Sequence, residues 1–309
     1  MNSTFPDNLK IANITPVHKK SSKALKDNYR PVSVLPNISK VFESLIHSKI
    51  ADYFNDILSE HQFGFRKGYS TQDCLIYILE NWKLTLDEGK SFGALLTDLS
   101  KAFDCISHEL LIAKLQAYGF DNNSLAFIFD YFSNRRQRVR VNSSYSDWTQ
   151  ITEGVPQGSI LGPLFFNIYI CDLLFALQGH NIASYADDTT PFSLGDNITE
   201  VKSELELISK KLFAWLSVNQ MKGNADKCHL ITNKFSSDHI LVENSLVPNC
   251  KEAKLLGIIF DNNLSFETHV TNLCSKASVK LSALSRIMPY MSIPKRKILV
   301  NSFFLSQFG

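Results

Sequence analysis

Two aspartates stand side by side in an apolar setting, in the segment Tyr185-Ala186-Asp187-Asp188. Adjacent carboxylates repel each other, and their removal from water adds a further free-energy cost. A bound divalent cation offsets both costs, and carboxylate oxygens are the hard ligands that Mg²⁺ prefers. A bare Asp-Asp pair is also at home in a solvated turn. The remainder of the chain must therefore decide between a metal site and a turn.

Strand and helix patterns follow one another in mixed order. An apolar run from Ser91 that ends abruptly at Asp98 predicts a buried strand, and residues 181–192 predict a hairpin with the Asp pair at its tip. Apolar spacings of three and four predict helices over 39–54, 71–88, 107–119, 161–177, 199–218, 266–288 and 294–304. Further predictions are a hairpin at 135–148, strands at 227–232 and 253–261, and a basic loop at 6–36. This order indicates an α+β fold.

Charge is unevenly distributed along the chain. Residues 1–70 carry 10 Lys and Arg against 6 Asp and Glu, residues 71–250 carry 14 against 21, and residues 251–309 carry 8 against 3. The two ends are therefore basic and the middle is acidic. A basic rim around an acidic centre suits a polyanion held over a metal site, although ordinary surface charge can give the same totals.

Cysteine spacing and hydropathy exclude several classes of protein. The six cysteines form no C-x-x-C pair, which argues against a zinc knuckle and a disulfide framework. The N-terminus has no apolar signal core, so secretion is not expected. The most apolar run, residues 160–179, contains Gly162, Pro163, Asn167 and Asp172. It is predicted to be a buried core helix, and no membrane association is expected.

Five motifs stand in a fixed order along the chain. They are Asn28-Tyr-Arg-Pro-Val-Ser, Gln62-Phe-Gly-Phe-Arg-Lys-Gly-Tyr-Ser-Thr-Gln, Asp98-Leu-Ser-Lys-Ala-Phe-Asp, Gly154-Val-Pro-Gln-Gly-Ser and Tyr185-Ala-Asp-Asp. Each motif alone is a weak signal, and the ordered set is specific. Over nearly all 309 residues the chain resembles the reverse transcriptase domain of a non-LTR retrotransposon of the LINE type, jockey-like.

The resemblance implies a right-hand polymerase fold with an antiparallel palm sheet. Fingers are expected at 1–90 with a contribution from 121–150, the palm at 91–262, and a truncated helical thumb at 263–309. The implied activity is RNA-directed DNA polymerase, a nucleotidyltransferase that adds dNTPs to a DNA primer on an RNA template. An intracellular protein is expected, with nuclear residence implied by the life cycle of such elements, whose primer is chromosomal DNA.

The resemblance also assigns the catalytic residues. Two Mg²⁺ ions roughly 3.5–4 Å apart, with Mn²⁺ as a substitute, can activate the primer hydroxyl and hold the leaving pyrophosphate. Asp98 and Asp187 are expected to bridge both ions, and Asp188 is expected to be a weaker or outer ligand. Lys227 matches a late lysine that protonates the departing pyrophosphate; the alternative is an ordinary surface lysine.

Further residues are assigned to the substrates. Phe103 is expected to be a steric gate, a ring under the sugar that rejects a 2′-hydroxyl, and Asp104 is expected to be structural. Nucleotide and template contacts are expected from a set spread over four motifs, namely Arg30, Arg66, Lys67, Gln157, Gly158 and Tyr185. Free N–H groups at the helix start after Gly158 would suit an anion. Gly257 resembles a primer-grip hairpin, and an acid-free cluster is a candidate contact with the template backbone: Arg135, Arg136, Arg138 and Arg140.

Two alternatives stay open. Family members usually have further domains on both sides, so the chain is expected to be a fragment of a retrotransposon polyprotein with low processivity. One alternative is therefore a non-catalytic nucleic-acid-binding relic. The other is a metal-dependent nuclease, which also uses clustered acids but has no use for a gating ring at Phe103. The oligomeric state is left open.

Overall fold

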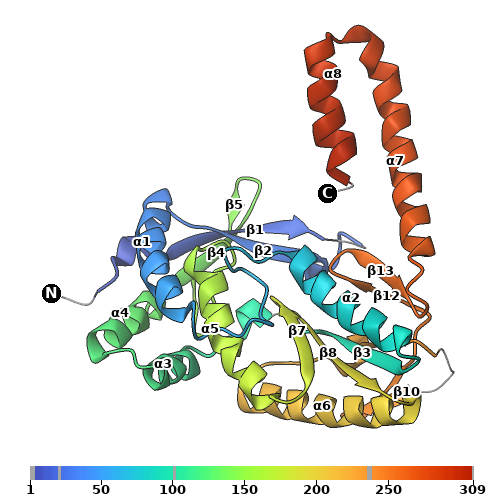
Figure 1. The fold of residues 1–309 in the computed structure, drawn as a ribbon. Coiled ribbons are helices and arrows are strands. Elements are labelled where there is room, and N and C mark those ends of the chain that lie inside the picture. The colour runs from blue at the N-terminus through green and yellow to red at the C-terminus, as the bar shows by residue number, and fades with distance from the viewer. Residues whose placement is uncertain (1–3, 20–21, 100–101, 235–238, 308–309) are drawn as a thin grey trace.

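An antiparallel sheet of four strands lies at the centre of the fold (Figure 1), and it carries Asp98 and Asp188. The computed structural model describes residues 4–19, 22–99, 102–234 and 239–307. The strands lie in the order β7 (Asn181–Tyr185), β8 (Asp188–Gly195), β3 (Ser91–Asp98) and β9 (His229–Thr232). Ser100 and Lys101, which belong to the motif that begins at Asp98, lie outside the described residues, as do the last two residues of the chain.

Both faces of this sheet are covered by helices. Successive side chains of β3 point to opposite faces, so the strand contributes to a core on each side. Leu95 packs in one core with α5 (Leu161–Ala176) and α6 (Ile198–Val218). Ala94 and Leu96 pack in a second core with α2 (Thr71–Asp87). Asp98 has the parity of Leu96 and lies on the α2 side of the sheet. The buried run thus forms a central strand, and the helices on both faces explain why its middle, residues 92–96, has no polar side chain.

A second, mixed sheet overturns the expectation of a basic loop at 6–36. It is built from β1 (Ile11–His18), β2 (Tyr29–Val34), β4 (Arg136–Val141), β5 (Ser144–Tyr145) and β6 (Thr149–Gln150). β1 runs antiparallel to β2 and parallel to β4. Pro16 lies beyond Ile14, where the pairing with β4 ends, so its missing N–H interrupts no ladder on that side. Prolines are typical of loops, so the sequence of this segment favours a loop. The parallel partner of β1 lies far along the chain and leaves no sign in the local sequence.

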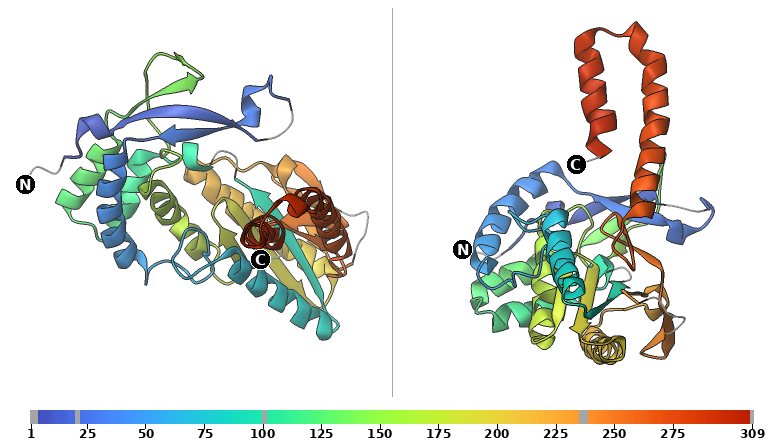
Figure 2. Two further views of the ribbon diagram at one scale, coloured as in Figure 1. Left: turned by 90° about the horizontal axis from the view of Figure 1, so that it is seen from above. Right: turned by 45° about the vertical axis from the view of Figure 1, so that its right-hand side comes forward.

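Three helices pack at the end of the fold remote from α2 (Figure 2). They are α1 (Asn37–Phe54), α3 (His108–Ala117) and α4 (Asn122–Phe132). α1 begins earlier than expected, and Ser39 lies inside it, where its hydroxyl donates to Glu43 rather than capping the helix. α4 was not expected from the sequence, although Asp121 caps its first turn by accepting from the amides of Asn123 and Ser124 at 2.8 and 3.1 Å.

The C-terminal part begins with two small hairpins and ends in a helical arm. The hairpins are β10 (His239–Val242) with β11 (Ser245–Pro248), and β12 (Glu252–Leu255) with β13 (Ile258–Asp261). The prediction of a single strand at 253–261 is wrong, because Leu256 and Gly257 have positive φ and form a turn. The arm consists of α7 (Glu267–Ile287) and α8 (Ile293–Leu299), followed by a π-helical turn at Val300–Phe304.

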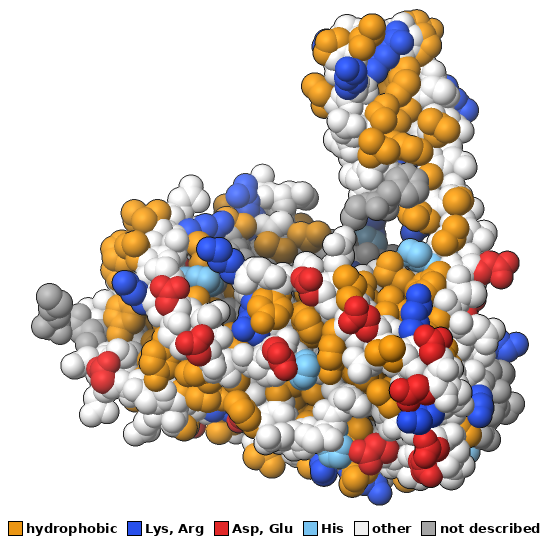
Figure 3. All heavy atoms as spheres, in the orientation of Figure 1, with side chains coloured by type: hydrophobic (Ala, Val, Ile, Leu, Met, Phe, Trp, Pro, Cys, Tyr) orange, Lys and Arg blue, Asp and Glu red, His pale blue; other side chains and the backbone are white. Residues whose placement is uncertain are grey.

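The helical arm projects from the body, as Figures 1 and 2 show. Figure 3 shows hydrophobic side chains gathered along it, and Val279 and Tyr290 are 71% and 90% exposed. The expected helices at 266–288 and 294–304 are present, and the buried residues in them are Ala277 and Leu284. Among the described helices, none combines the length and the apolar composition needed to cross a membrane.

Candidate active site

Asp98 and Asp188 are brought together by strand register. Asp98 ends β3, Asp188 begins β8, and the two residues are directly paired in the antiparallel ladder. Side chains of directly paired residues lie on one face of a sheet with Cβ atoms about 5 Å apart. Asp187 stands in the two-residue turn between β7 and β8, after Ala186 with φ 56°. This β7–β8 unit, called the acidic hairpin below, therefore presents its two aspartates beside the end of β3.

Electrostatics show that the three carboxylates interact. The pKa of Asp188 is raised to about 6 by partial burial first, then by the charges of Asp187 and Asp98. Lys19, just after β1, opposes the shift. Burial first, and then the charge of Asp188, raise the pKa of the Cys74 thiol on α2 to about 12. A site that holds anions together against repulsion is poised to accept a cation.

The raised pKa predicts a pH-dependent gain in stability for Asp188→Asn. The folded-state pKa of about 6 exceeds the ordinary value of 3.8, so the stabilisation from this group is full below pH 3.8 and is lost as the pH rises through 6. In metal-free buffer at pH 7.5, we expect Asp188→Asn to raise the free energy of unfolding by about 1 kcal/mol after allowance for solvent screening. Denaturant unfolding at pH 7.5 and pH 4 measures the effect. An equal gain at both pH values would contradict it.

Lys227 reaches the same edge of the sheet. Its Nζ lies 3.6 Å from Oδ2 of Asp98, and both side chains are about half exposed. The residue ends a 3₁₀ turn at Ala225–Lys227, which Asn224 caps through the amide of Asp226. It therefore precedes β9 rather than beginning it, as the expected strand 227–232 would have had it. This placement brings an ammonium group to the acidic residues without making it part of the sheet.

The donor set at this edge fits a hard divalent cation. It consists of the carboxylates of Asp98, Asp187 and Asp188, which are close enough to perturb one another. Oxygen ligands of this kind suit Mg²⁺ and Mn²⁺ and are poor ligands for thiophilic metals. Within the ranges that the structure describes, no three Asp, Glu, His or Cys side chains are already drawn together in ligating geometry. The three aspartates at this edge of the sheet therefore suit a divalent cation in their charge and in their ligand atoms.

Phe103 lies in a 3₁₀ turn at Ala102–Asp104, shortly after the end of β3. Its ring is stacked on Phe166 of α5, with centroids 4.8 Å apart and planes at 23°, and the edge of Phe65 meets it at 5.8 Å. Its carbonyl accepts the amide of Val155 at 2.8 Å. The ring is half-buried and held on two sides. A fixed, partly exposed ring can act as a wall for a ligand as well as a part of the core.

Gln157 and Gly158 lie against β2. The side-chain amide of Gln157 donates from Nε2 to Oδ1 of Asp104 at 2.9 Å, so Asp104 orients this amide. The carbonyl of Gln157 accepts the amide of Ser33 at 2.7 Å. Gly158 has φ +123°, and a Cβ there would stand 2.6 Å from the Ser33 carbonyl oxygen. Only glycine fits this backbone approach.

The expectation of free N–H groups at the start of α5 is wrong. The fully buried carboxylate of Glu43, on α1, accepts from the amides of Ile160 at 2.6 Å and Leu161 at 3.3 Å. Ser159 accepts from the next amide, that of Gly162, at 2.9 Å. An internal anion therefore occupies the position that an external phosphate would need. In the sequence, Glu43 is a single acidic residue inside an amphipathic helix, and nothing near it indicates a partner 117 residues away.

Arg66, assigned to the triphosphate, makes contacts within its own loop. It donates to the carbonyls of Ser59 at 2.5 Å and Gln62 at 3.1 Å and stacks on the ring of Tyr69 at 4.2 Å. Arg66 thus shapes the loop that leads to α2.

The other assigned contact residues differ in their surroundings. Lys67 follows Arg66 in the same loop and is exposed, and Arg30 is exposed on β2. Both present their charges to solvent. Tyr185 is the last residue of β7 and is packed beside the α2 core. The two basic residues are therefore accessible to a ligand, whereas Tyr185 is largely part of the packing.

The arginine cluster divides into one buried and three peripheral residues. Arg135 is fully buried, donates from Nε to the Tyr131 carbonyl at 2.7 Å and stacks on that tyrosine ring. It cannot contact a template backbone as expected. Arg136, Arg138 and Arg140 alternate along β4 and so share one face of the strand.

Sequence reasoning did not single out the residues behind the acidic hairpin. Gln62 forms a parallel bridge with Ser184 of β7, and a Cβ on Gly64 would stand 2.3 Å from the amide nitrogen of Ala186. Asn167 of α5 donates from Nδ2 to the Gly64 carbonyl at 2.7 Å. Gln62 and Gly64 belong to one of the five ordered motifs, but their contacts with the hairpin are visible only in three dimensions.

Comparison with solved structures defines the class of fold. The apo telomerase of Candida tropicalis, truncated from its C-terminal domain, matches 83% of this chain and 54% of its own with a TM-score of 0.59 and 12% identity. Telomerase from Candida albicans, in complex with a TWJ fragment of telomeric RNA, matches 89% of this chain and 50% of its own with a TM-score of 0.55 and 13% identity. The mixed α+β architecture is therefore a right-hand polymerase fold, as expected.

Sequence comparison then gives the family. The profile described as "Reverse transcriptase (RNA-dependent DNA polymerase)" matches residues 17–260, and the chain belongs to this family. In Drosophila melanogaster, the probable RNA-directed DNA polymerase from transposon BS is 32% identical over 281 residues, which are 86% of this chain and 31% of that protein. The polymerase of mobile element jockey is 28% identical over 309 residues, 95% of this chain and 33% of that protein. The expected jockey-like relationship is confirmed, and the chain spans about a third of the length of these relatives.

Proposed function

We propose that this chain is the polymerising unit of an RNA-directed DNA polymerase. The observation that carries the proposal is the direct pairing of Asp98 with Asp188 beside Asp187, at the edge of an antiparallel sheet. In-line phosphoryl transfer needs positioned negative ligands for two cations and little other chemistry from the protein. Family membership supports the reaction, and the donor set supports the metals. A chromosomal primer would place the reaction in the nucleus.

In this mechanism the carboxylates of Asp98, Asp187 and Asp188 would hold two divalent ions. When bound, the ions supply Lewis-acid activation of the primer 3′-hydroxyl and neutralise charge on the pyrophosphate. Lys227, 3.6 Å from Asp98, donates a proton to the leaving pyrophosphate. The four side chains thus cover both ends of the reaction, the attacking oxygen and the leaving group.

Selection of the nucleotide falls to residues beside the acidic edge. Phe103 lies under the incoming sugar, where its stack on Phe166 keeps the ring in place. Gln157, held by Asp104, faces the nucleotide. Gly158 lets this segment approach β2 closely. These roles rest on the fixed geometry of the ring and of the amide.

The same proposal divides the molecule into functional regions. Fingers comprise residues 1–90 with 121–150, the palm comprises 91–262, and the projecting helices from 263 onward are the thumb. The pairing of β1 with β4 supports the contribution of 121–150 to the fingers, because it joins the two segments in one sheet. Lys67 and Arg30 extend from the fingers toward the triphosphate. The β12–β13 turn at Gly257 is the primer grip.

The β4–β5 hairpin is proposed to contact single-stranded template. The guanidinium of Arg138 lies 4.0 Å from the ring centroid of Tyr145 and 4.5 Å from that of Trp148, and both aromatic residues are more than 40% exposed. Arg136 and Arg140 are exposed on the same face of the strand. Guanidinium groups for phosphates next to aromatic faces for bases are the combination that single-stranded nucleic acid requires.

Substitution of Arg136 and Arg140 by Gln should weaken template binding in a salt-dependent way. Each lost phosphate contact is expected to reduce the slope of log K against log salt by about 0.7, because fewer counterions are released from a single strand. Fluorescence anisotropy with an RNA oligonucleotide at several salt concentrations measures the slope. Lys210→Gln, on the exposed face of α6, is the control and should leave the slope unchanged. An unchanged slope in the double variant would remove the hairpin from the template path.

Primer extension on poly(rA)·oligo(dT), with and without Mg²⁺, tests the proposed function. Purified protein should add dTTP to the primer only with Mg²⁺ or Mn²⁺, and Asp187→Asn should abolish the addition. Binding of the substrate without incorporation would favour the non-catalytic relic. Shortening of labelled duplexes without primer extension would favour the nuclease. Either result would overturn the proposal.

A further inference from the structure

We propose that residues His61–Gly64 and Asn167 form a brace that sets the position of the acidic hairpin, and that Asn167 is a positioning residue for polymerisation. The inference rests on the proposed function, because it assigns a role at the same site. The brace residues lie behind the hairpin and act on substrate and metal only through it. Their role is to hold Tyr185-Ala186-Asp187-Asp188 at a set distance from α5.

The loop at His61–Gly64 contacts the acidic hairpin directly. The amide of Ser184 donates to the His61 carbonyl at 2.9 Å, and the amide of Phe63 donates to the Ser184 carbonyl at 2.8 Å. These bonds add a short parallel segment to β7 immediately before the turn. Gly64 then lies directly against that turn, where a Cβ would come within 2.3 Å of the Ala186 nitrogen. The hairpin tip is therefore in backbone-to-backbone contact with the loop.

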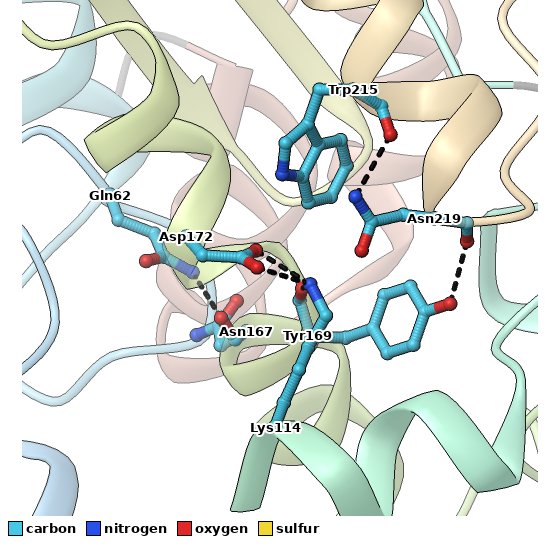
Figure 4. Close-up of polar contacts among 7 residues, drawn as sticks. All are labelled: Gln62, Lys114, Asn167, Tyr169, Asp172, Trp215 and Asn219. Atoms are coloured by element: carbon cyan, nitrogen blue, oxygen red, sulfur yellow. Dashed lines mark hydrogen bonds and ion pairs between the residues drawn. The ribbon is translucent and has the colours of Figure 1, made fainter. Parts of the chain in front are cut away.

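The same loop is attached to α5 by two hydrogen bonds. Nε2 of Gln62 donates to the Asn167 carbonyl at 2.8 Å, and Nδ2 of Asn167 donates to the Gly64 carbonyl at 2.7 Å (Figure 4 shows the first of these bonds). Both side chains are almost completely buried. Asn167 therefore holds the loop at two points, one through its main chain and one through its side chain.

α5 is itself anchored to three other helices. Lys114 of α3 donates to the Tyr169 carbonyl at 2.8 Å and pairs with Asp172 at 2.6 Å, and the Tyr169 hydroxyl donates to the Asn219 carbonyl at 2.6 Å (Figure 4). The buried carboxylate on α1 holds the N-terminus of the same helix. α5 is thus tied to α1, α3 and the end of α6, and it gives Asn167 a firm base.

The chemistry of the brace favours positioning over stability. Oε1 of Gln62 and Oδ1 of Asn167 are buried and have no hydrogen-bond partner among the described residues. A buried amide with an unpaired oxygen costs free energy, and apolar side chains of similar shape would fill the space at lower cost. The directional bonds nevertheless fix the loop, and a misplacement of about 1 Å at a reacting centre can lower a rate on the order of 100-fold.

The test compares two brace variants with two matched controls in the full chain. Gly64→Ala adds one methyl group against the hairpin backbone, and Asn167→Leu removes the bond to Gly64 while keeping the volume. Gly195→Ala is the control for the first, because it lies at the far end of β8 and its nearest neighbour is a side-chain methyl group at 3.3 Å. Asn249→Leu is the control for the second, because it also removes a buried amide bond, to the Thr232 hydroxyl at 2.9 Å, and leaves the anchors of α5 in place.

Amide hydrogen exchange of residues 182–189 is the decisive measurement, because it reports on the hairpin without any catalysis. Both brace variants should accelerate exchange there about tenfold, and the controls should not. Primer extension should show kcat reduced on the order of 100-fold with an unchanged KM for dTTP. Asn167→Leu and Asn249→Leu should lower the melting temperature to a similar extent, so a loss of stability alone cannot explain the difference in kcat.

The outcomes separate this inference from the proposed function. Unchanged hairpin exchange in both brace variants, or equal acceleration in Asn249→Leu, would overturn the brace. Faster hairpin exchange with kcat unchanged would also overturn it, since the position would then not matter for the reaction. If wild-type protein fails to extend primers, the proposed function fails, and the exchange comparison still decides whether the brace holds the hairpin.

Discussion

Replacement of Asp98 by Asn is expected to lower the rate of nucleotide incorporation by about 1,000-fold or more. The substitution keeps the shape of the side chain and removes one of the three carboxylates that would hold the ions in the proposed mechanism. A loss of several kcal/mol of transition-state stabilisation corresponds to a factor of this size. Single-nucleotide incorporation under single-turnover conditions measures it directly.

The fold should survive this change. Asp98 contributes to the repulsion that raises the pKa of Asp188, so a neutral amide relieves charge at this edge of the sheet. Asp196→Asn is the matched control, because it makes the same change just beyond the opposite end of β8, 4.0 Å from Lys90. It should leave incorporation unchanged. Incorporation by Asp98→Asn at a rate near that of wild type would leave the proposed mechanism without its first ligand.

Replacement of Phe103 by Val is expected to reduce discrimination against ribonucleotides on the order of 100-fold. A clash with a well-packed wall costs about 1–3 kcal/mol, and a smaller side chain removes the clash with the 2′-hydroxyl. The ring is suited to the role because Phe166 and Phe65 hold it from two sides. The ratio of kcat/KM for dTTP and UTP measures the effect.

Phe103→Tyr is the control for the gate, because it preserves the flat ring and should preserve the ratio. Val also removes the ring stack on Phe166, so some loss of stability is expected and is measured separately by denaturant unfolding. A ratio that stays constant in Phe103→Val, together with a general fall in kcat/KM, would make Phe103 a core residue only.

Much of the central sheet can be predicted from the chain alone. The apolar run ending at Asp98 and the segment around the Asp pair are local patterns, and the structure contains both strands. α2, α5 and α6 are also predictable, because their apolar content is strong and local signals mark their ends. At the start of α2, for example, Ser70 and Asp73 form a capping box. The order of five motifs indicates the family, which the profile match to residues 17–260 confirms.

Non-local pairing explains where the sequence predictions fail. β1 and β2 read as a loop because Pro16 and Pro31 interrupt them, and in the structure these prolines lie opposite each other in one ladder. The other edge of β1 is paired in parallel with β4, where Ile14 lies beside Val139. Backbone hydrogen bonds to so distant a strand leave no periodic signal in either segment, so local propensity alone favours a loop.

Residue type and motif order by themselves indicated which side chains are candidates for the chemistry, because carboxylates suit divalent cations and the ordered motifs are typical of one family. The tertiary structure alone decided which polar groups remain available to a ligand. Arg135 is buried against Tyr131, and Glu43 already occupies the amides at the start of α5, whereas Asp98 and Asp188 are paired at an edge of the sheet. The physical reason is that most buried polar groups find a partner inside the fold, and that partner can come from any part of the chain.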